Sequence, residues 1–159
     1  MPRLKTIDAE LDAVTDAVLL SSRALVAVAS RSIAAVDESV TLPQFRALVV
    51  LDRDDAGLRV GELAHELRIQ PSTATRLCDR LVRRRLARRQ VNPANRREVT
   101  MLLTASGREV VAEVTLRRRR EIASIMAKVP ASQRVAIIDA LTAFREAAGE
   151  DDVVAAVPW

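Results

Sequence analysis

The sequence has few of the residues that most catalytic and metal sites require. Its 159 residues include one histidine, His65, one cysteine, Cys78, and four glycines. A lone histidine supplies no convincing catalytic triad, and no phosphate-binding glycine loop, nucleophile elbow or His-Glu-x-x-His motif is present. His65 also lacks metal-ligand spacing to any Cys, Asp or Glu, so a surface or structural histidine is the better interpretation. We predict a protein that is not an enzyme, with no catalytic residue, metal or cofactor.

We also expect neither a disulfide nor a targeting segment. One cysteine excludes an internal disulfide, which favours a reducing compartment. Met1-Pro2-Arg3 begins no signal-peptide pattern, and no apolar run approaches the roughly 18 residues of a membrane span. We therefore expect a soluble, cytoplasmic protein. Cys78 falls on the apolar face of its helix, which favours a buried thiol over a redox sensor.

Positive charge is concentrated in one part of the chain. Residues 57–104 carry 11 basic and 4 acidic side chains, a balance of +7, whereas residues 1–56 have a balance of −3 and residues 105–159 of 0. This localisation is typical of a surface that binds phosphates and releases their counterions. We expect phosphate contacts from 83–85 and 88–89, two arginine runs for which a solvated charged face is the alternative. In the run 117–120, pairing with Glu113 and Glu121 at helical spacing favours a solvated or intersubunit role.

The basic segment predicts a helix-turn-helix. Residues 58–67 predict a short amphipathic helix, residues 68–70 a tight turn, and Pro71 the start of a second helix, because its missing N–H costs nothing in a first turn. Apolar residues at helical spacing bury one face of the second helix. Its other face is basic and rich in hydroxyls: Ser72, Thr73, Arg76, Arg80, Arg83 and Arg84.

A basic hairpin follows this second helix. Two β-like runs, residues 86–91 and 98–103, enclose a turn-rich tip at residues 92–97 that carries Arg96 and Arg97. A basic hairpin beside a recognition helix is a wing. Helix and wing can then read the major and the minor groove of one duplex.

Long amphipathic helices are predicted on both sides of the basic segment. Apolar spacing predicts one over residues 6–36, and Pro43 the first turn of the next, which begins at Thr41 or Leu42. Gly57 suits a turn with a positive φ angle. Ser132 is predicted to cap the last helix and Gly149 to end it. Phe45 is as compatible with an effector pocket as with plain core.

The predicted fold is mainly α with a small β wing: a winged helix-turn-helix core flanked by N- and C-terminal dimerisation helices. Residues 1–159 form one domain, with dimerisation helices at 6–36 and 108–148, the winged helix-turn-helix at 42–104 and a tail at 150–159. We call the winged helix-turn-helix at 42–104 the reading head. Two reading heads related by a two-fold axis would bind a near-palindromic DNA site.

Several stretches together resemble a MarR-type transcriptional regulator. They are Thr41–Leu48, Val60–Ala64, Pro71–Leu81, Asn95–Arg97 and Leu103–Gly107. The resemblance implies a homodimeric winged-helix DNA-binding protein, usually a repressor, often released by a small aromatic or phenolic ligand or by oxidation. The positions that match the family's recognition-helix residues are Gln70, Ser72, Thr73, Thr75, Arg76 and Arg80, and those that match its wing are Arg96 and Arg97.

The sequence departs from this family at two positions. Asn95 stands where the family usually has Asp before the wing arginines, so the charge-assisted hydrogen bond that orients them is lost. Arg85 stands where the family usually has Gly. If Arg85 takes a left-handed conformation, it costs roughly 1 kcal/mol.

We expect a sequence-specific regulator that binds double-stranded DNA. The alternatives are a sequence-nonspecific architectural DNA binder, or a helical dimer that binds an acidic protein partner. The predicted DNA-binding residues are Gln70, Ser72, Thr73, Thr75, Arg76, Arg80, Arg83, Arg84, Arg88, Arg96 and Arg97.

Overall fold

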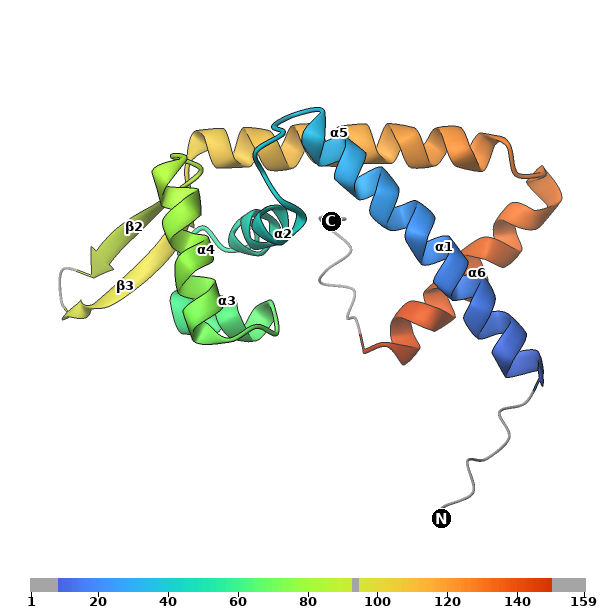
Figure 1. Cartoon of the computed structure of the whole chain (residues 1–159), viewed down its shortest axis with the longest axis horizontal. Helices are drawn as coiled ribbons and strands as arrows, with labels where there is room; N and C mark the ends of the chain where they lie inside the picture. Colours follow the sequence, from blue (N-terminus) through green and yellow to red (C-terminus); the bar gives the residue numbers. More distant parts are fainter. Residues whose placement is uncertain (1–8, 93–94, 150–159) are drawn as a thin grey trace, which may run out of the picture.

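The computed structural model describes residues 9–92 and 95–149, with no side-chain description for residues 92 and 95–98. The elements follow in the order α1 (Ala9–Ala34), α2 (Leu42–Leu51), β1 (Leu58–Arg59), α3 (Val60–Glu66), α4 (Pro71–Arg83), β2 (Ala87–Asn92), β3 (Asn95–Leu103), α5 (Ala105–Ala127) and α6 (Ala131–Ala147). This confirms the predicted fold class. In Figure 1, α2, α3, α4 and the β hairpin lie at one end, α1 and α6 at the other, and α5 runs along both.

The three strands form an antiparallel sheet in the order β1-β3-β2. β2 and β3 form the predicted hairpin, and β1 adds Leu58 and Arg59 to the other edge of β3, opposite Met101 and Thr100. The prediction that the helix begins at Leu58 was therefore wrong. Helical spacing cannot separate two such residues from the helix that follows, because their pairing depends on a strand about 40 residues further along.

Helix starts follow local capping chemistry. Thr41 is the N-cap of α2, and Pro43 lies in the first turn. The N–H of Thr41 donates to Oε1 of Gln44 at 2.8 Å. Thr104 caps α5 by accepting from the N–H of Gly107 at 3.0 Å. Ser132, predicted to cap α6, lies instead inside its first turn, because the extended backbone of Pro130 lets the helix begin at Ala131.

The predicted roles of two glycines are confirmed. Gly57 in the loop after α2 has φ +78°, and Gly149 after α6 has φ +69°. At Gly57 a Cβ atom would also lie 2.5 Å from the carbonyl oxygen of Met101, so the turn needs glycine for space as well as for its backbone angle.

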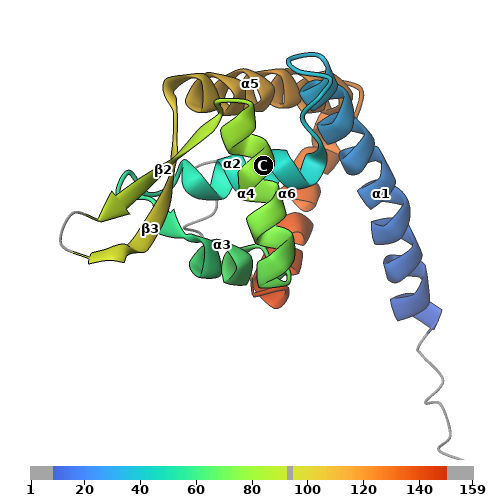
Figure 2. The same ribbon diagram turned by 60° about the vertical axis from the view of Figure 1, so that its left-hand side comes forward.

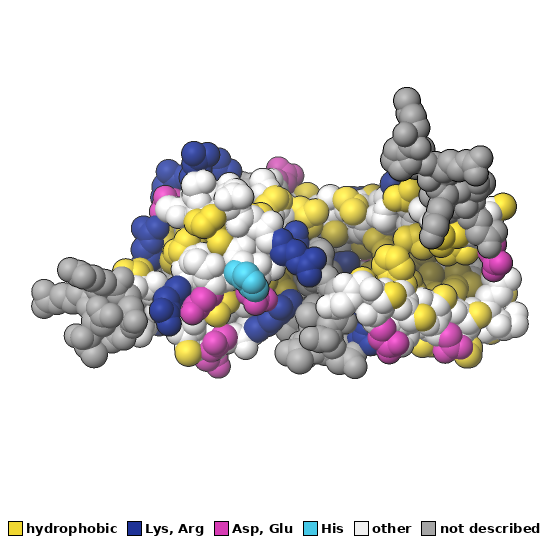
Figure 3. Space-filling view, turned by 90° about the horizontal axis from the view of Figure 1, so that it is seen from below, with side chains coloured by type: hydrophobic (Ala, Val, Ile, Leu, Met, Phe, Trp, Pro, Cys, Tyr) yellow, Lys and Arg dark blue, Asp and Glu magenta, His cyan; other side chains and the backbone are white. Residues whose placement is uncertain are grey.

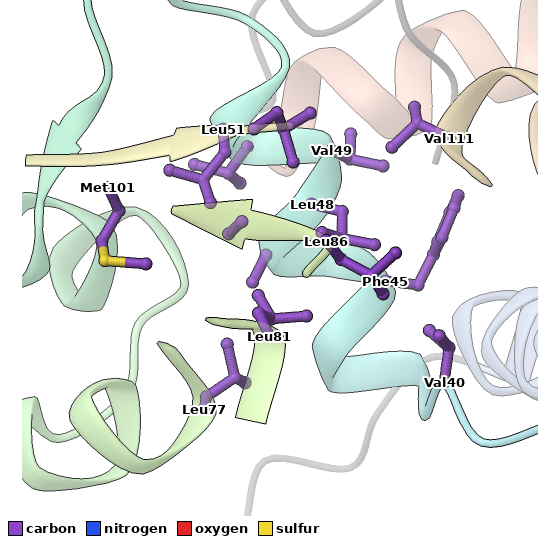
Figure 4. Packing of buried hydrophobic residues seen from close by; sticks show 14 of the residues in the cluster. Val40, Phe45, Leu48, Val49, Leu51, Leu77, Leu81, Leu86, Met101 and Val111 are labelled. Carbon is purple, nitrogen blue, oxygen red and sulfur yellow. The ribbon is translucent and has the colours of Figure 1, made fainter. Parts of the chain in front are cut away.

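The hydrophobic core lies in the reading head and under the first half of α5. Phe45, Leu48, Leu81, Met101 and Val111 from four elements are buried together (Figure 4). Phe45 is only 2% exposed and packs in this cluster, which supports core over effector pocket. The core holds α4 firmly against the rest of the head.

The other end of the molecule presents apolar side chains to solvent. Buried residues of α1 are confined to its last turns, at Val28, Ala29, Ser32 and Ile33, and α6, described over its whole length, has none. Apolar side chains gather over this end in Figure 3. The large exposed ones on α1 and α6 are Leu11, Val14, Leu19, Leu20, Leu25, Val26, Val135, Ile138, Leu141 and Phe144.

By length and composition alone, α1 could cross a membrane. An 18-residue window in it has a mean hydropathy of 1.5, with 11% of the window buried. This corrects the expectation of no such segment, which considered only uninterrupted apolar runs. The end of α1 nearest α2 packs on α2 and α5, and Arg31 pairs with Glu121 of α5. The helix is therefore held at one end and stands clear of the head along the other (Figure 2).

Candidate DNA-binding surface

A tight turn sets α4 at the surface of the reading head. Leu67 ends α3, and Arg68 takes a left-handed conformation with φ 53°. The N–H of Ile69 donates to the carbonyl of Ala64 at 3.0 Å, which closes the turn. Gln70 is then the extended N-cap of α4, and Pro71 its first residue. Sequence spacing predicted this turn but not the left-handed angle at Arg68, which glycine would favour.

One face of α4 is buried and the other is exposed. Ala74, Leu77, Cys78 and Leu81 pack into the core. The predicted DNA-binding residues of this helix and its N-cap are exposed on the remaining surface: Gln70, Ser72, Thr73, Thr75, Arg76, Arg80 and Arg83. The ion pairs among the described residues include none from Arg76, Arg80 or Arg83. Hydroxyl and guanidinium donors of this kind can contact both base edges and phosphates.

Arg84 differs from the arginines beside it. At the C-cap of α4, its Nη2 donates to Oδ2 of Asp37 at 2.6 Å, and the two side chains are 30% and 25% exposed. Burial raises the pKa of the Asp37 carboxyl, but hydrogen bonds from Ser39 and the charge of Arg84 outweigh it, so the pKa lies below its ordinary 3.8. Arg84 therefore has an acceptor inside the protein. Sequence reasoning missed Asp37 as the partner of Arg84 because 47 residues separate the two. The one local signal for an ordered Asp37 carboxylate was Ser39 two residues later, whose N–H and hydroxyl donate to it.

The arginines of β2 are also partly engaged. Nη2 of Arg89 donates to Oδ1 of Asp79, the one acid on α4. Nη1 of Arg88 donates to the neutral side chain of Gln90 at 2.8 Å, and Arg88 remains exposed. The charge of Arg88 is therefore not paired with a carboxylate among the described residues, whereas that of Arg89 is paired with Asp79.

The wing arginines lie on the hairpin. Arg96 and Arg97 belong to β3, which pairs with β2 up to a register shift between Val91 and Asn92. Their side chains, and that of Asn95, lie outside the described part of the structure. The hairpin backbone therefore places the two positions at its distal end, and the expected consequence of Asn95 remains a prediction.

Arg85 takes the left-handed conformation considered for it, with φ 59°. Its carbonyl accepts from Oγ1 of Thr104 at 2.7 Å, and the same hydroxyl lies 3.0 Å from the carbonyl oxygen of Leu86. Thr104 thus ties the turn after α4 to the start of α5. The turn keeps its shape although no glycine is present.

Cys78 and His65 lie in surroundings of opposite kinds. Cys78 is fully buried, and burial raises the pKa of its thiol despite the nearby charge of Arg89. A raised pKa disfavours the reactive thiolate, so the geometry supports a packing role. His65 is exposed on α3.

The basic run on α5 is paired only in part. Arg117 donates to Oε1 of Glu113 at 2.8 Å, as expected from helical spacing. Glu121, predicted to pair with the same run, pairs instead with Arg31 of α1. Nε and Nη1 of Arg118 are buried and have no hydrogen-bond partner among the described residues.

Known proteins are similar to this chain in both sequence and fold. The family model described as MarR family matches residues 39–98. RV1404 from Mycobacterium tuberculosis, of known crystal structure, is 45% identical over 92% of this chain and 99% of its own, with a TM-score of 0.81. The chain belongs to the MarR family.

Two further relatives agree with this membership. A MarR family protein from Bacillus stearothermophilus is 25% identical, covers 91% of this chain and 99% of its own, and has a TM-score of 0.75. The uncharacterized HTH-type transcriptional regulator YsmB of Bacillus subtilis (strain 168) is 33% identical over 81 residues. That match spans 51% of this chain and only 55% of YsmB. The MarR family consists of DNA-binding transcriptional regulators, not enzymes.

Proposed function

We propose that this MarR-family protein is a sequence-specific, homodimeric DNA-binding regulator that acts as a repressor in the cytoplasm. Each subunit lays α4 into a major groove, and Arg96 and Arg97 of the wing reach the minor groove or phosphate. The site is near-palindromic, with half-sites about one helical turn apart. Following the family, a small aromatic or phenolic effector releases the repressor.

The observation that carries the proposal is the exposed face of α4. Ser72, Thr73 and Gln70 at its start present hydroxyl and amide groups, and Arg76 and Arg80 follow one and two turns later. A coat of cations alone would suffice for nonspecific binding. Hydroxyl, amide and guanidinium groups on one helix face are instead the groups that read base edges in the major groove.

The homodimer accounts for the apolar end of the molecule. Residues 6–36 and 108–148 act as dimerisation segments, and residues 42–104 as the DNA-binding part of one domain. Ten large apolar side chains are exposed on α1 and α6, and such a cluster is typical of a protein–protein interface. A second copy, related by a two-fold axis, covers this surface and sets the two α4 helices on one face.

A binding titration tests this function directly. Purified protein is titrated with DNA from immediately upstream of its coding region and with scrambled DNA of equal length, at several salt concentrations. We expect a preference of about 10³ or more for the specific DNA, with two subunits per site. Weak, salt-sensitive and sequence-blind binding would point to an architectural DNA binder, and no binding at low salt would overturn the function.

Two arginine variants separate base reading from phosphate contact. Arg76→Ala should cost about 1–3 kcal/mol and relax sequence preference, because Arg76 lies on the exposed face of α4. Arg88→Ala is the control: it removes an exposed cation of β2 and should weaken binding to specific and random DNA evenly. Equal losses on both DNAs for Arg76→Ala would contradict the assignment of α4 as the reading helix.

A further inference from the structure

We propose that Arg84 is a positioning residue: its ion pair with Asp37 fixes the recognition helix α4 relative to the dimerisation helix α1, and so sets the half-site spacing that the dimer accepts. This reassigns Arg84, which the sequence placed among the phosphate contacts. The inference rests on the proposed function, because half-site spacing has a meaning only for a dimer on DNA.

The Asp37 carboxylate is built to hold one orientation. Oδ1 accepts from the N–H of Ser39 at 3.0 Å and from its hydroxyl, which leaves Oδ2 for Arg84 at 2.6 Å. The backbone is fixed on both sides: the N–H of Asp37 donates to Ile33 at 2.9 Å, and its carbonyl accepts from Val40 at 3.0 Å. A carboxylate with three donors does not turn freely toward solvent.

Arg84 is oriented away from the exposed face of α4. Its Nε is buried, and Nη2 is bound to Asp37, whereas neighbouring Arg83 is exposed and has no ion pair in the described structure. A phosphate contact by Arg84 would require leaving the carboxylate and exposing a half-buried side chain. Arg83 can contact phosphate at no such cost, and it therefore serves as the matched control.

The ion pair between Asp37 and Arg84 links the end of α1 to the end of α4. Asp37 follows the last turns of α1, whose Ile33 belongs to the core, and Arg84 caps the C-terminal end of α4. α4 packs mainly on α3, β2 and α2, all within the reading head. The ion pair adds a direct tie from α4 to the end of α1. A tilt of α1 in the dimer is then carried to α4 by a fixed charged contact as well as by apolar packing.

The test uses full-length protein and the operator found by titration, together with operators whose half-sites are moved apart or together by one base pair. The variants are Arg84→Gln, Asp37→Asn, the double variant and the control Arg83→Gln. Each is checked for folded helix content by circular dichroism and for its oligomeric state by light scattering. Arg84→Met, which also removes the charge but keeps an apolar stem of similar length, replaces Arg84→Gln should the latter fail to fold.

A positioning role predicts a distinct combination of results. Arg84→Gln and Asp37→Asn should each reduce the wild-type preference for correct spacing by about fivefold or more, and the double variant should lose no more than either single one. The salt dependence of binding should stay as in the wild type. Arg83→Gln should do the opposite: it keeps the spacing preference and lowers the slope of log K against log salt by roughly 1.8, one phosphate contact per subunit.

Two results would overturn the inference while leaving the proposed function intact. One is a lower salt slope for Arg84→Gln that matches Arg83→Gln, which would make Arg84 a phosphate contact. The other is an unchanged spacing preference in Asp37→Asn. Failure of the wild type to prefer any operator would instead overturn the proposed function itself, and with it this inference.

Discussion

At the scale of single residues, two arginines occupy backbone conformations that favour glycine. Arg68 closes the turn between α3 and α4 with φ 53°, and Arg85 closes the turn after α4 with φ 59°. Each puts a Cβ atom close to the following carbonyl oxygen, which costs roughly 1–2 kcal/mol. Hydrogen bonds around each turn hold the conformation. The family resemblance pointed to Arg85 because glycine is usual there, whereas the sequence alone carried no such signal at Arg68.

Replacing Arg85 by glycine should therefore stabilise the protein. Relief of the left-handed strain exceeds the flexibility that glycine adds to the unfolded chain, and we expect a gain of roughly 0.5–1 kcal/mol. Urea unfolding at one fixed protein concentration measures it. Arg83→Gly, at the last residue of α4 two positions earlier, is the control and should lose up to about 1 kcal/mol. A loss for Arg85→Gly would mean that its side chain makes contacts worth more than the strain.

At the scale of elements, the sequence predicted what depends on neighbouring residues. Thr41, expected to begin its helix, caps α2 by a contact three residues away, and spacing on α4 separated its buried from its exposed face. Apart from the cap expected at Ser132 and the left-handed angle of Arg68, what it missed depends on distant residues. β1 exists because Leu58 lies opposite Met101, and Arg84 turns inward because the fold brings Asp37 to it across 47 residues. No local pattern contains either partner.

Arg118 gives the element scale its own prediction. Its Nε and Nη1 are buried without acceptors in the described part of the chain, and burial lowers the pKa of its guanidinium. Arg118→Met keeps the length of the side chain and removes the desolvated charge, so it should stabilise the protein by about 1–2 kcal/mol.

Chemical denaturation checks this expectation, with Arg117→Met as the control. Arg117 is exposed and paired with Glu113, and its loss should change stability by less than about 0.5 kcal/mol. A clear destabilisation by Arg118→Met would show that the guanidinium has an acceptor beyond the protomer, and the partner subunit would then be the place to look.

At the scale of the whole molecule, the two ends differ in how far their apolar side chains are buried. The reading head buries its own core, whereas α1 and α6 expose apolar side chains that nothing within the described protomer covers. By hydropathy alone, these apolar side chains could be buried either in a membrane or against a second copy of the chain. Three observations favour the copy: α6 carries the same kind of surface, Arg31 of α1 pairs with Glu121 of α5, and the chain belongs to a family of DNA-binding proteins.

The variant Ile138→Glu on α6 distinguishes burial against a second copy from burial in a membrane. Ile138 is 63% exposed in the protomer, and a dimer interface would bury a carboxylate there without a partner. We expect dimer affinity to fall by about 30- to 100-fold, on the order of 2–3 kcal/mol, and operator affinity to fall with it, as measured by analytical ultracentrifugation and DNA titration. Gln133→Glu, an exposed polar position on the same helix, should leave both unchanged. Retention of Ile138→Glu as an operator-binding dimer would place the interface elsewhere, and recovery of the wild type only in detergent would assign α1 to a membrane.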